Sequence, residues 1–177
     1  MTLRAFLREE TRADHERVDA AYGAHDLRDA SAYASFLRAH HAALCGLPVL
    51  TPFGLPRVDQ RAALEADLAG LRCPLPSPAP QLALDTEAER LGAYYVLVGS
   101  RLGARVLADA LFATRAPHAA HARYLNDRSA ETAWRRLRAV LSDDPLPAPA
   151  GRTHVLAGAR AAFAHFERAA RADEIAA

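Results

Sequence analysis

The residues with the clearest chemical consequence are three glycines in the segment Leu91–Leu107, which reads LGAYYVLVGSRLGARVL. Gly92, Gly99 and Gly103 are seven and four residues apart, so in a helix they fall on roughly one face. Each glycine inside a helix costs about 1 kcal/mol relative to alanine. A helix with this stripe leaves its backbone bare, either for close packing of another helix or for a flat, bulky ligand.

His15 is the second candidate, in the segment TLRAFLREETRADHERVD. It continues a series of i+4 steps that predicts a buried helix face: Leu3, Leu7, Thr11 and His15. A histidine on such a face is either a hydrogen-bonded core residue or a ligand. A neutral imidazole on one helix can bind iron, while a helix with a bare stripe covers the plane of a macrocycle. Arg8 lies seven residues before His15, almost in line with it along the helix.

Length, charge and cysteine content limit the classes of protein. A chain of 177 residues is expected to form one domain over residues 1–177. Lys+Arg 22 against Asp+Glu 21 gives a formal net charge of +1, which offers no broad basic field for nucleic acid. Cys45 and Cys73 have no metal-binding spacing and indicate reduced thiols. The N-terminus does not resemble a signal peptide, and no apolar run is long enough for a membrane span, so a cytoplasmic protein is expected.

The periodicity of apolar residues predicts helices and no strands. Proline-rich stretches predict two extended connectors, CPLPSPAP from Cys73 and DDPLPAPAG from Asp143. A short turn or helix is expected from Pro117 to Leu125. The predicted helices are Leu3–Tyr22, Ser31–Leu44, Val58–Leu71, Thr86–Phe112, one that carries Trp134 and Leu137 to Leu141, and Thr153–Arg171.

Other chemistries lack their motifs. There is no Glu-x-x-His pair for a di-iron bundle and no GxSxG, P-loop or GxGxxG motif. His118 and His121 could contact one metal ion, but a solvated loop explains them better because no third ligand is near in sequence. His40 and His41 are adjacent and point to different faces, so one is expected to pack and the other to meet water.

Two motifs carry a resemblance to the bacterial haem oxygenases, particularly those associated with bacteriophytochromes. LREETRADHERVD resembles that family's proximal helix, and GAYYVLVGSRLGARVL resembles its distal helix with the G-S-x-L-G signature at residues 99–103. The resemblance covers most of the chain. Val98 stands where the family often has an acidic residue, and Ser100 where animal members have an aspartate.

The resemblance implies an all-α, single-domain fold that holds haem between the proximal helix and a kinked, Gly-rich distal helix. It implies His15 as the axial iron ligand. Gly99 and Gly103 would let the distal helix approach the ring, and backbone groups near Gly99, with Ser100, would hold water. By resemblance and helical phase, the expected partners of the haem propionates are Arg8, Tyr94 and Arg135.

The activity so implied is the oxidative opening of haem to biliverdin, with release of carbon monoxide and ferrous iron. Haem is then both substrate and cofactor, and dioxygen is consumed. Electrons would come from a ferredoxin, flavodoxin or reductase, because the chain has no flavin or iron–sulfur motif. A bacteriophytochrome is a candidate recipient of the biliverdin, and iron acquisition is the other candidate purpose. The alternatives are a non-catalytic haem-binding or sensory protein on the same fold, and a helical bundle without haem in which His15 is merely packed.

Overall fold

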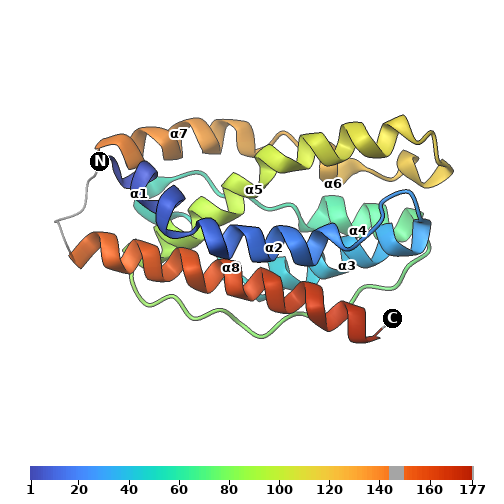
Figure 1. The fold of residues 1–177 in the computed structure, drawn as a ribbon, viewed down its shortest axis with the longest axis horizontal. Coiled ribbons are helices and arrows are strands. Elements are labelled where there is room, and N and C mark those ends of the chain that lie inside the picture. Colours follow the sequence, from blue (N-terminus) through green and yellow to red (C-terminus); the bar gives the residue numbers. More distant parts are fainter. Residues whose placement is uncertain (144–149, 177) are drawn as a thin grey trace.

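The computed structural model describes residues 1–143 and 150–176, and within them the chain is helical with no strand (Figure 1). The all-α expectation is therefore confirmed. Two short 3-10 turns, Pro52–Gly54 and Pro117–Ala120, interrupt the connections. The α-helices are α1 (Leu3–Glu10), α2 (Arg12–Gly23), α3 (Ala30–Gly46), α4 (Arg61–Gly70), α5 (Glu87–Ala113), α6 (Arg123–Asn126), α7 (Ala130–Asp143) and α8 (Ala150–Ala176).

The two longest helices, α5 and α8, form the centre of the bundle. They make the most extensive helix–helix contact, and α8 also packs against α2 and α3. Beyond that contact, α5 leaves α8 and packs against α6 and α7, as its diagonal course in Figure 1 shows. The start of α5 is sharply defined because Thr86 and Glu89 cap it reciprocally, each side chain bonding the other's backbone N–H.

The α5–α8 contact brings two backbones together at glycines. A Cβ added to Gly92 would overlap the carbonyl oxygen of Val155 and lie 2.6 Å from the amide nitrogen of Ala159. On the opposite helix, a Cβ added to Gly158 would overlap the carbonyl oxygen of Glu89. Gly92 therefore serves close helix packing, which is one of the two roles that its stripe predicts.

The N-terminal segment forms two helices where the sequence predicts one. The chain bends at Thr11 (φ −106°, ψ 10°), which separates α1 from α2. The buried Thr11 hydroxyl donates to the carbonyl oxygen of Leu7 at 2.7 Å. A threonine hydroxyl that bonds back four residues competes with regular helix geometry and bends helices. The predicted continuous helix Leu3–Tyr22 is wrong at this one residue.

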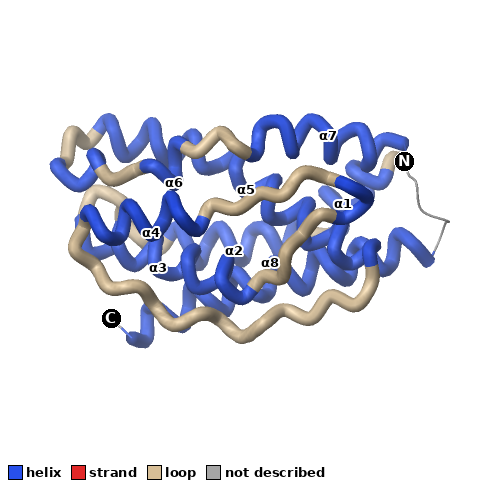
Figure 2. Tube along the Cα trace, turned by 180° about the vertical axis from the view of Figure 1, so that it is seen from behind, coloured by secondary structure: helices blue, strands red, loops and turns tan. Residues whose placement is uncertain are grey.

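The first proline-rich connector is extended, as its composition predicts. It runs along one edge of the bundle between α4 and α5 (Figure 2) and is fastened to α3 by backbone hydrogen bonds. Ala79 N–H donates to the Ala42 carbonyl at 3.0 Å, and Leu82 N–H donates to the Gly46 carbonyl at 2.8 Å. Most of the second connector lies at residues 144–149, outside the described part. No helix in the described ranges has the length and apolarity needed to cross a bilayer.

His40 is half-buried, and neither it nor His41 is fully exposed, whereas one of the two was expected to meet water. His41 is buried, and His40 lies against Tyr22 and Tyr124, with ring centroids 4.1 and 5.2 Å away. His40 Nδ1 is 2.9 Å from the Phe36 carbonyl oxygen. Burial lowers the pKa of His40 to about 3, because the surrounding rings do not solvate an imidazolium.

The packing at Gly92 predicts opposite effects of alanine along α5. Gly92→Ala forces α5 and α8 apart, and overpacking against a backbone costs about 1–3 kcal/mol of the free energy of unfolding. Gly103→Ala meets no described atom and should raise that free energy by up to about 1 kcal/mol through helix propensity. Urea unfolding of the two variants measures the difference. Equal stabilities would contradict the close packing.

The buried histidines predict a loss of stability in mild acid. Burial also lowers the pKa of His165. In the unfolded chain both imidazoles bind protons below a pKa of about 6.5. In the folded protein the two imidazoles have lowered pKa values, so protons bind preferentially to the unfolded chain. The free energy of unfolding should therefore fall as the pH drops from about 6.5 toward 3. Urea unfolding at pH 7, 6 and 5 tests this above the range in which carboxylates titrate. His40→Phe should flatten the dependence, and an unchanged slope would contradict it.

Candidate functional site

His15 lies on α2 with its side chain 58% exposed, so the expectation of a buried position is wrong. The first three members of its series, Leu3, Leu7 and Thr11, are buried. Each i+4 step advances about 40° around a helix, so after three steps the series has rotated by about 120°. This drift and the bend at Thr11 carry His15 off the core face.

The His15 ring is nevertheless held in a defined orientation. Its Nδ1 lies 2.9 Å from Asp19 Oδ2, one turn further along α2. Its ring meets Phe163 of α8 edge-on, with the centroids 5.7 Å apart. A hydrogen on Nδ1 that is donated to Asp19 leaves the lone pair on Nε2. A carboxylate that fixes the tautomer in this way is the usual support for a metal-binding histidine.

The rest of the glycine stripe is uncovered, in contrast to Gly92. Among the described residues, a Cβ at Gly103 would meet no atom within 4 Å, and one at Gly99 would meet only Cζ3 of Trp134, at 3.9 Å. Val106, one turn beyond Gly103, is 69% exposed, and Leu107 beside it is also exposed. This part of α5 presents bare backbone and apolar side chains that no described residue covers.

The neighbouring residues Val98 and Ser100 point in different directions. The Val98 side chain is fully buried, so it faces the core rather than the glycine stripe. The Ser100 side chain is exposed, and its hydroxyl donates to the Leu97 carbonyl at 2.8 Å. The Ser100 oxygen keeps lone pairs that can accept a hydrogen bond from water.

The two neighbouring tyrosines of α5 differ in burial and in hydrogen bonding. Tyr94 is fully buried, and its hydroxyl donates to the Pro56 carbonyl at 2.6 Å; burial raises its pKa to about 12. Tyr95 is half-buried, and the charges of Arg4 and Arg8 oppose the rise in its pKa that burial causes. Tyr95, rather than Tyr94, is therefore within electrostatic reach of the arginines of α1.

Arg8 and Arg135 are both exposed. Arg135 donates to the Thr132 hydroxyl at 3.2 Å and lines a surface hollow of about 330 Å³ with Arg138, Ala139 and Ser142. Arg4, one turn before Arg8, lies over the Trp134 ring with its Cζ 5.8 Å from the ring centroid. Trp134 therefore lies beside Arg4 of α1, and its Cζ3 is 3.9 Å from the Cβ position of Gly99 on α5.

Of the predicted residues, the structure places Gly99 beside a group that the sequence did not single out. The Trp134 ring lies near the Cβ position of Gly99 and beneath the Arg4 guanidinium, and the charges of Arg4 and Arg8 act on Tyr95. His15 does not lie within 4 Å of the Cβ positions of Gly99 or Gly103. The arrangement offers one oriented imidazole nitrogen, an apolar bare backbone and nearby cations. These are the groups that a flat, iron-containing dianion such as haem requires, so the residues fit that group.

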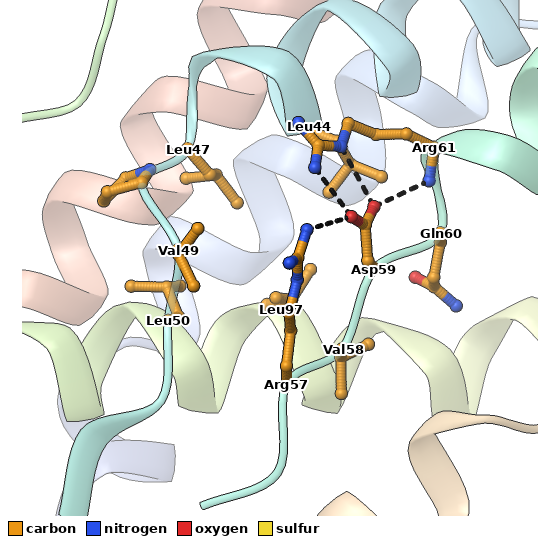
Figure 3. A pocket seen from close by; sticks show the side chains of 11 residues that line it. Leu44, Leu47, Val49, Leu50, Arg57, Val58, Asp59, Gln60, Arg61 and Leu97 are labelled. Carbon is orange, nitrogen blue, oxygen red and sulfur yellow. Dashed lines mark hydrogen bonds and ion pairs between the residues drawn. The ribbon is translucent and has the colours of Figure 1, made fainter.

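A separate small cavity lies on another face of α5 (Figure 3). It holds about 50 Å³, and Asp59 at its rim binds Arg57 and Arg61 at 2.5 and 2.6 Å. Arg61, with help from Arg57, holds the pKa of Asp59 well below its usual range. Leu97 reaches this cavity and is about 200° around the helix from Gly99, so the cavity is not part of the stripe.

Sequence reasoning missed Asp19, Tyr95, Arg4 and Trp134 as site residues. Two of them had a local signal. Asp19 follows His15 at i+4, and Tyr95 precedes Gly99 at the same spacing. Arg4 and Trp134 had none, because their contact joins residues 130 positions apart in the chain.

No family model matches the chain. The chain is similar to a protein named heme oxygenase from Xanthomonas campestris pv. campestris (strain 8004). The two are 39% identical over 148 residues, which cover 78% of this chain and 88% of that protein. Identity at this level over most of both sequences, together with the all-helical fold, shows a common family. The chain belongs to the haem oxygenase family.

Proposed function

We propose that the protein opens haem oxidatively to biliverdin, releasing carbon monoxide and ferrous iron. It consumes dioxygen and takes electrons from a ferredoxin, a flavodoxin or a reductase. The observation that carries the proposal is an exposed histidine with one nitrogen fixed by a carboxylate, in a relative of a heme oxygenase. The bare backbone at Gly99 and Gly103 adds support, since nothing in the described chain uses it.

His15 holds the iron through Nε2, and Asp19 keeps the hydrogen on Nδ1 and the ring in place. When bound, haem supplies the iron at which dioxygen is activated and the ring that is oxidised. Gly99 and Gly103 let the backbone of α5 approach the ring more closely than any side chain would allow. The approach leaves room above only part of the ring and so favours one meso carbon.

The remaining residues orient the substrate and supply protons. Arg8 and Arg135 bind the two propionates as cations. Tyr95, on which the charge of Arg8 acts, is a better partner for a propionate than Tyr94, whose hydroxyl is occupied at Pro56. Water that donates to the Ser100 hydroxyl or to a backbone carbonyl near Gly99 would deliver protons to the reacting oxygen.

The proposed reaction takes place in the cytoplasm, and a bacteriophytochrome is a candidate acceptor of the biliverdin.

Haem titration followed by reduction in air tests the activity. The Soret band should appear on titration and be lost on turnover, with biliverdin identified by chromatography. A haem complex that survives reductant and air would favour the non-catalytic binding module. A failed titration would favour a bundle without haem.

Removal of the proposed iron ligand should separate binding from packing. His15→Ala should shift the Soret band and abolish most ring opening, while the free energy of unfolding changes little because the side chain is largely exposed. Added imidazole should restore part of the native spectrum. The measurements are haem titration, turnover and urea unfolding. An unchanged spectrum with normal biliverdin formation would remove His15 from the iron.

Two matched variants sharpen that test. Asp19→Ala keeps the ligand but frees its ring, and loss of such a support weakens metal binding by about 10–100-fold. His154→Ala removes another exposed histidine, on α8, and should leave the spectrum and turnover unchanged. Equal losses in the Asp19 and His154 variants would contradict the orienting role of Asp19.

A larger side chain at the open end of the stripe should block the site without unfolding the protein. Gly103→Leu meets no described atom, so the helical circular dichroism signal should persist while haem affinity or turnover falls at least tenfold, about 1.4 kcal/mol. Gly23→Leu, at another open glycine, is the control. Wild-type turnover in Gly103→Leu would show that haem does not approach this segment.

A further inference from the structure

The glycine stripe of α5 has a closed end, a bounded middle and an open end. At Gly92 the backbone of α8 covers it, and at Gly103 no described atom lies within 4 Å of a Cβ position. Between them, at Gly99, one side chain stands at the boundary: Cζ3 of Trp134, at 3.9 Å. A flat ligand that lies on the backbone of both Gly99 and Gly103 therefore meets the indole at its Gly99 edge.

The indole is well suited to act as a rigid stop. Trp134 is half-buried and packs against the hydrophobic core, so its ring does not rotate freely. The Arg4 guanidinium lies over the indole, 5.8 Å from the ring centroid and within the range of a cation–π interaction. Trp134 is thus braced from α1 while it faces α5.

The Trp134 ring also connects the two parts of the proposed haem site, the His15 helix and the glycine stripe of α5. α1 leads through the bend at Thr11 into α2, which carries His15, and α1 packs against α7. The charge of the same arginine, Arg4, also acts on Tyr95 of α5. If the indole were displaced or replaced by a smaller side chain, the edge of a bound macrocycle could move along α5 toward Tyr95. The iron would stay bound to His15, so the macrocycle would rotate about the iron.

We infer that Trp134 is a specificity-determining residue, whose indole stops the edge of the haem at Gly99 and so fixes which meso carbon is attacked. This inference rests on the proposed function. It goes further because it assigns the rotation of haem within its own plane to one side chain, which is neither the iron ligand nor a partner of the propionates. Arg4 acts through Trp134 and is a positioning residue.

The seating can be measured without turnover. In the ferric complex with cyanide, the proton NMR shifts of the ring methyl groups report how the macrocycle sits in its plane. Trp134→Ala should move the methyl pattern, Trp134→Phe should move it less, and Arg4→Gln should move it in the same direction. On turnover, a second biliverdin isomer should rise severalfold in Trp134→Ala. Val140→Ala, a truncation at another half-buried core contact of α7, should leave the pattern and the isomer unchanged.

The haem-free protein gives an independent view of the brace. Trp134 is the single tryptophan, so its emission reports this site alone. Arg4→Gln should shift the emission to the red and increase quenching by acrylamide, and Arg12→Gln should not. Unchanged emission in Arg4→Gln would overturn the positioning role of Arg4.

The outcomes distinguish this inference from the function on which it rests. A wild type that binds no haem overturns both. A wild type that binds haem and makes one biliverdin isomer, with the same methyl pattern and the same isomer in Trp134→Ala, overturns only the role of Trp134. Should Trp134→Ala fail to fold, Trp134→Phe and Arg4→Gln decide the question by the same two measurements.

Discussion

The backbone contact between α5 and α8 determines how the rest of this structure is used. With glycines at residues 92 and 158, each helix meets the carbonyl groups of the other, which fixes the rotation of α5 about its own axis. Beyond the crossing the helices separate, because α8 packs against α2 and α3 while α5 packs against α6 and α7. The face of α5 that is closed at Gly92 is consequently open at Gly103.

This arrangement separates the structural from the functional use of glycine within one helix. Each glycine costs about 1 kcal/mol of helix propensity. At Gly92 the close packing of α8 offsets that loss, whereas Gly103 has no packing in the described structure to offset it. Glycine thus lowers the stability of α5 at a position where alanine would fit. Such a loss of stability is typical of a site where activity opposes stability. Binding of a ligand to the folded state would recover the lost stability.

The sequence predicts the helices well, because amphipathic periodicity and capping residues are local signals. The expected helix Thr86–Phe112 corresponds to α5 with its cap at Thr86. The failures have local geometry or distant contacts as their cause. The bend at Thr11 depends on one side-chain hydrogen bond. The place of Tyr95 on the stripe follows from its i+4 spacing to Gly99, so that residue was open to prediction from the sequence. The pairing of Arg4 with Trp134 depends on the tertiary fold alone.

The histidines of this chain show why exposure favours His15 as a ligand. His40 and His165 each place a ring nitrogen near a backbone carbonyl, of Phe36 and Ala43, and burial lowers both pKa values. The His165 side chain is almost fully buried, so a flat ligand cannot reach its second nitrogen. His15 uses one nitrogen for Asp19, and its exposed ring meets Phe163 edge-on. The bend at Thr11 turns α2 so that this ring leaves the core face, which keeps the second nitrogen available to a large partner.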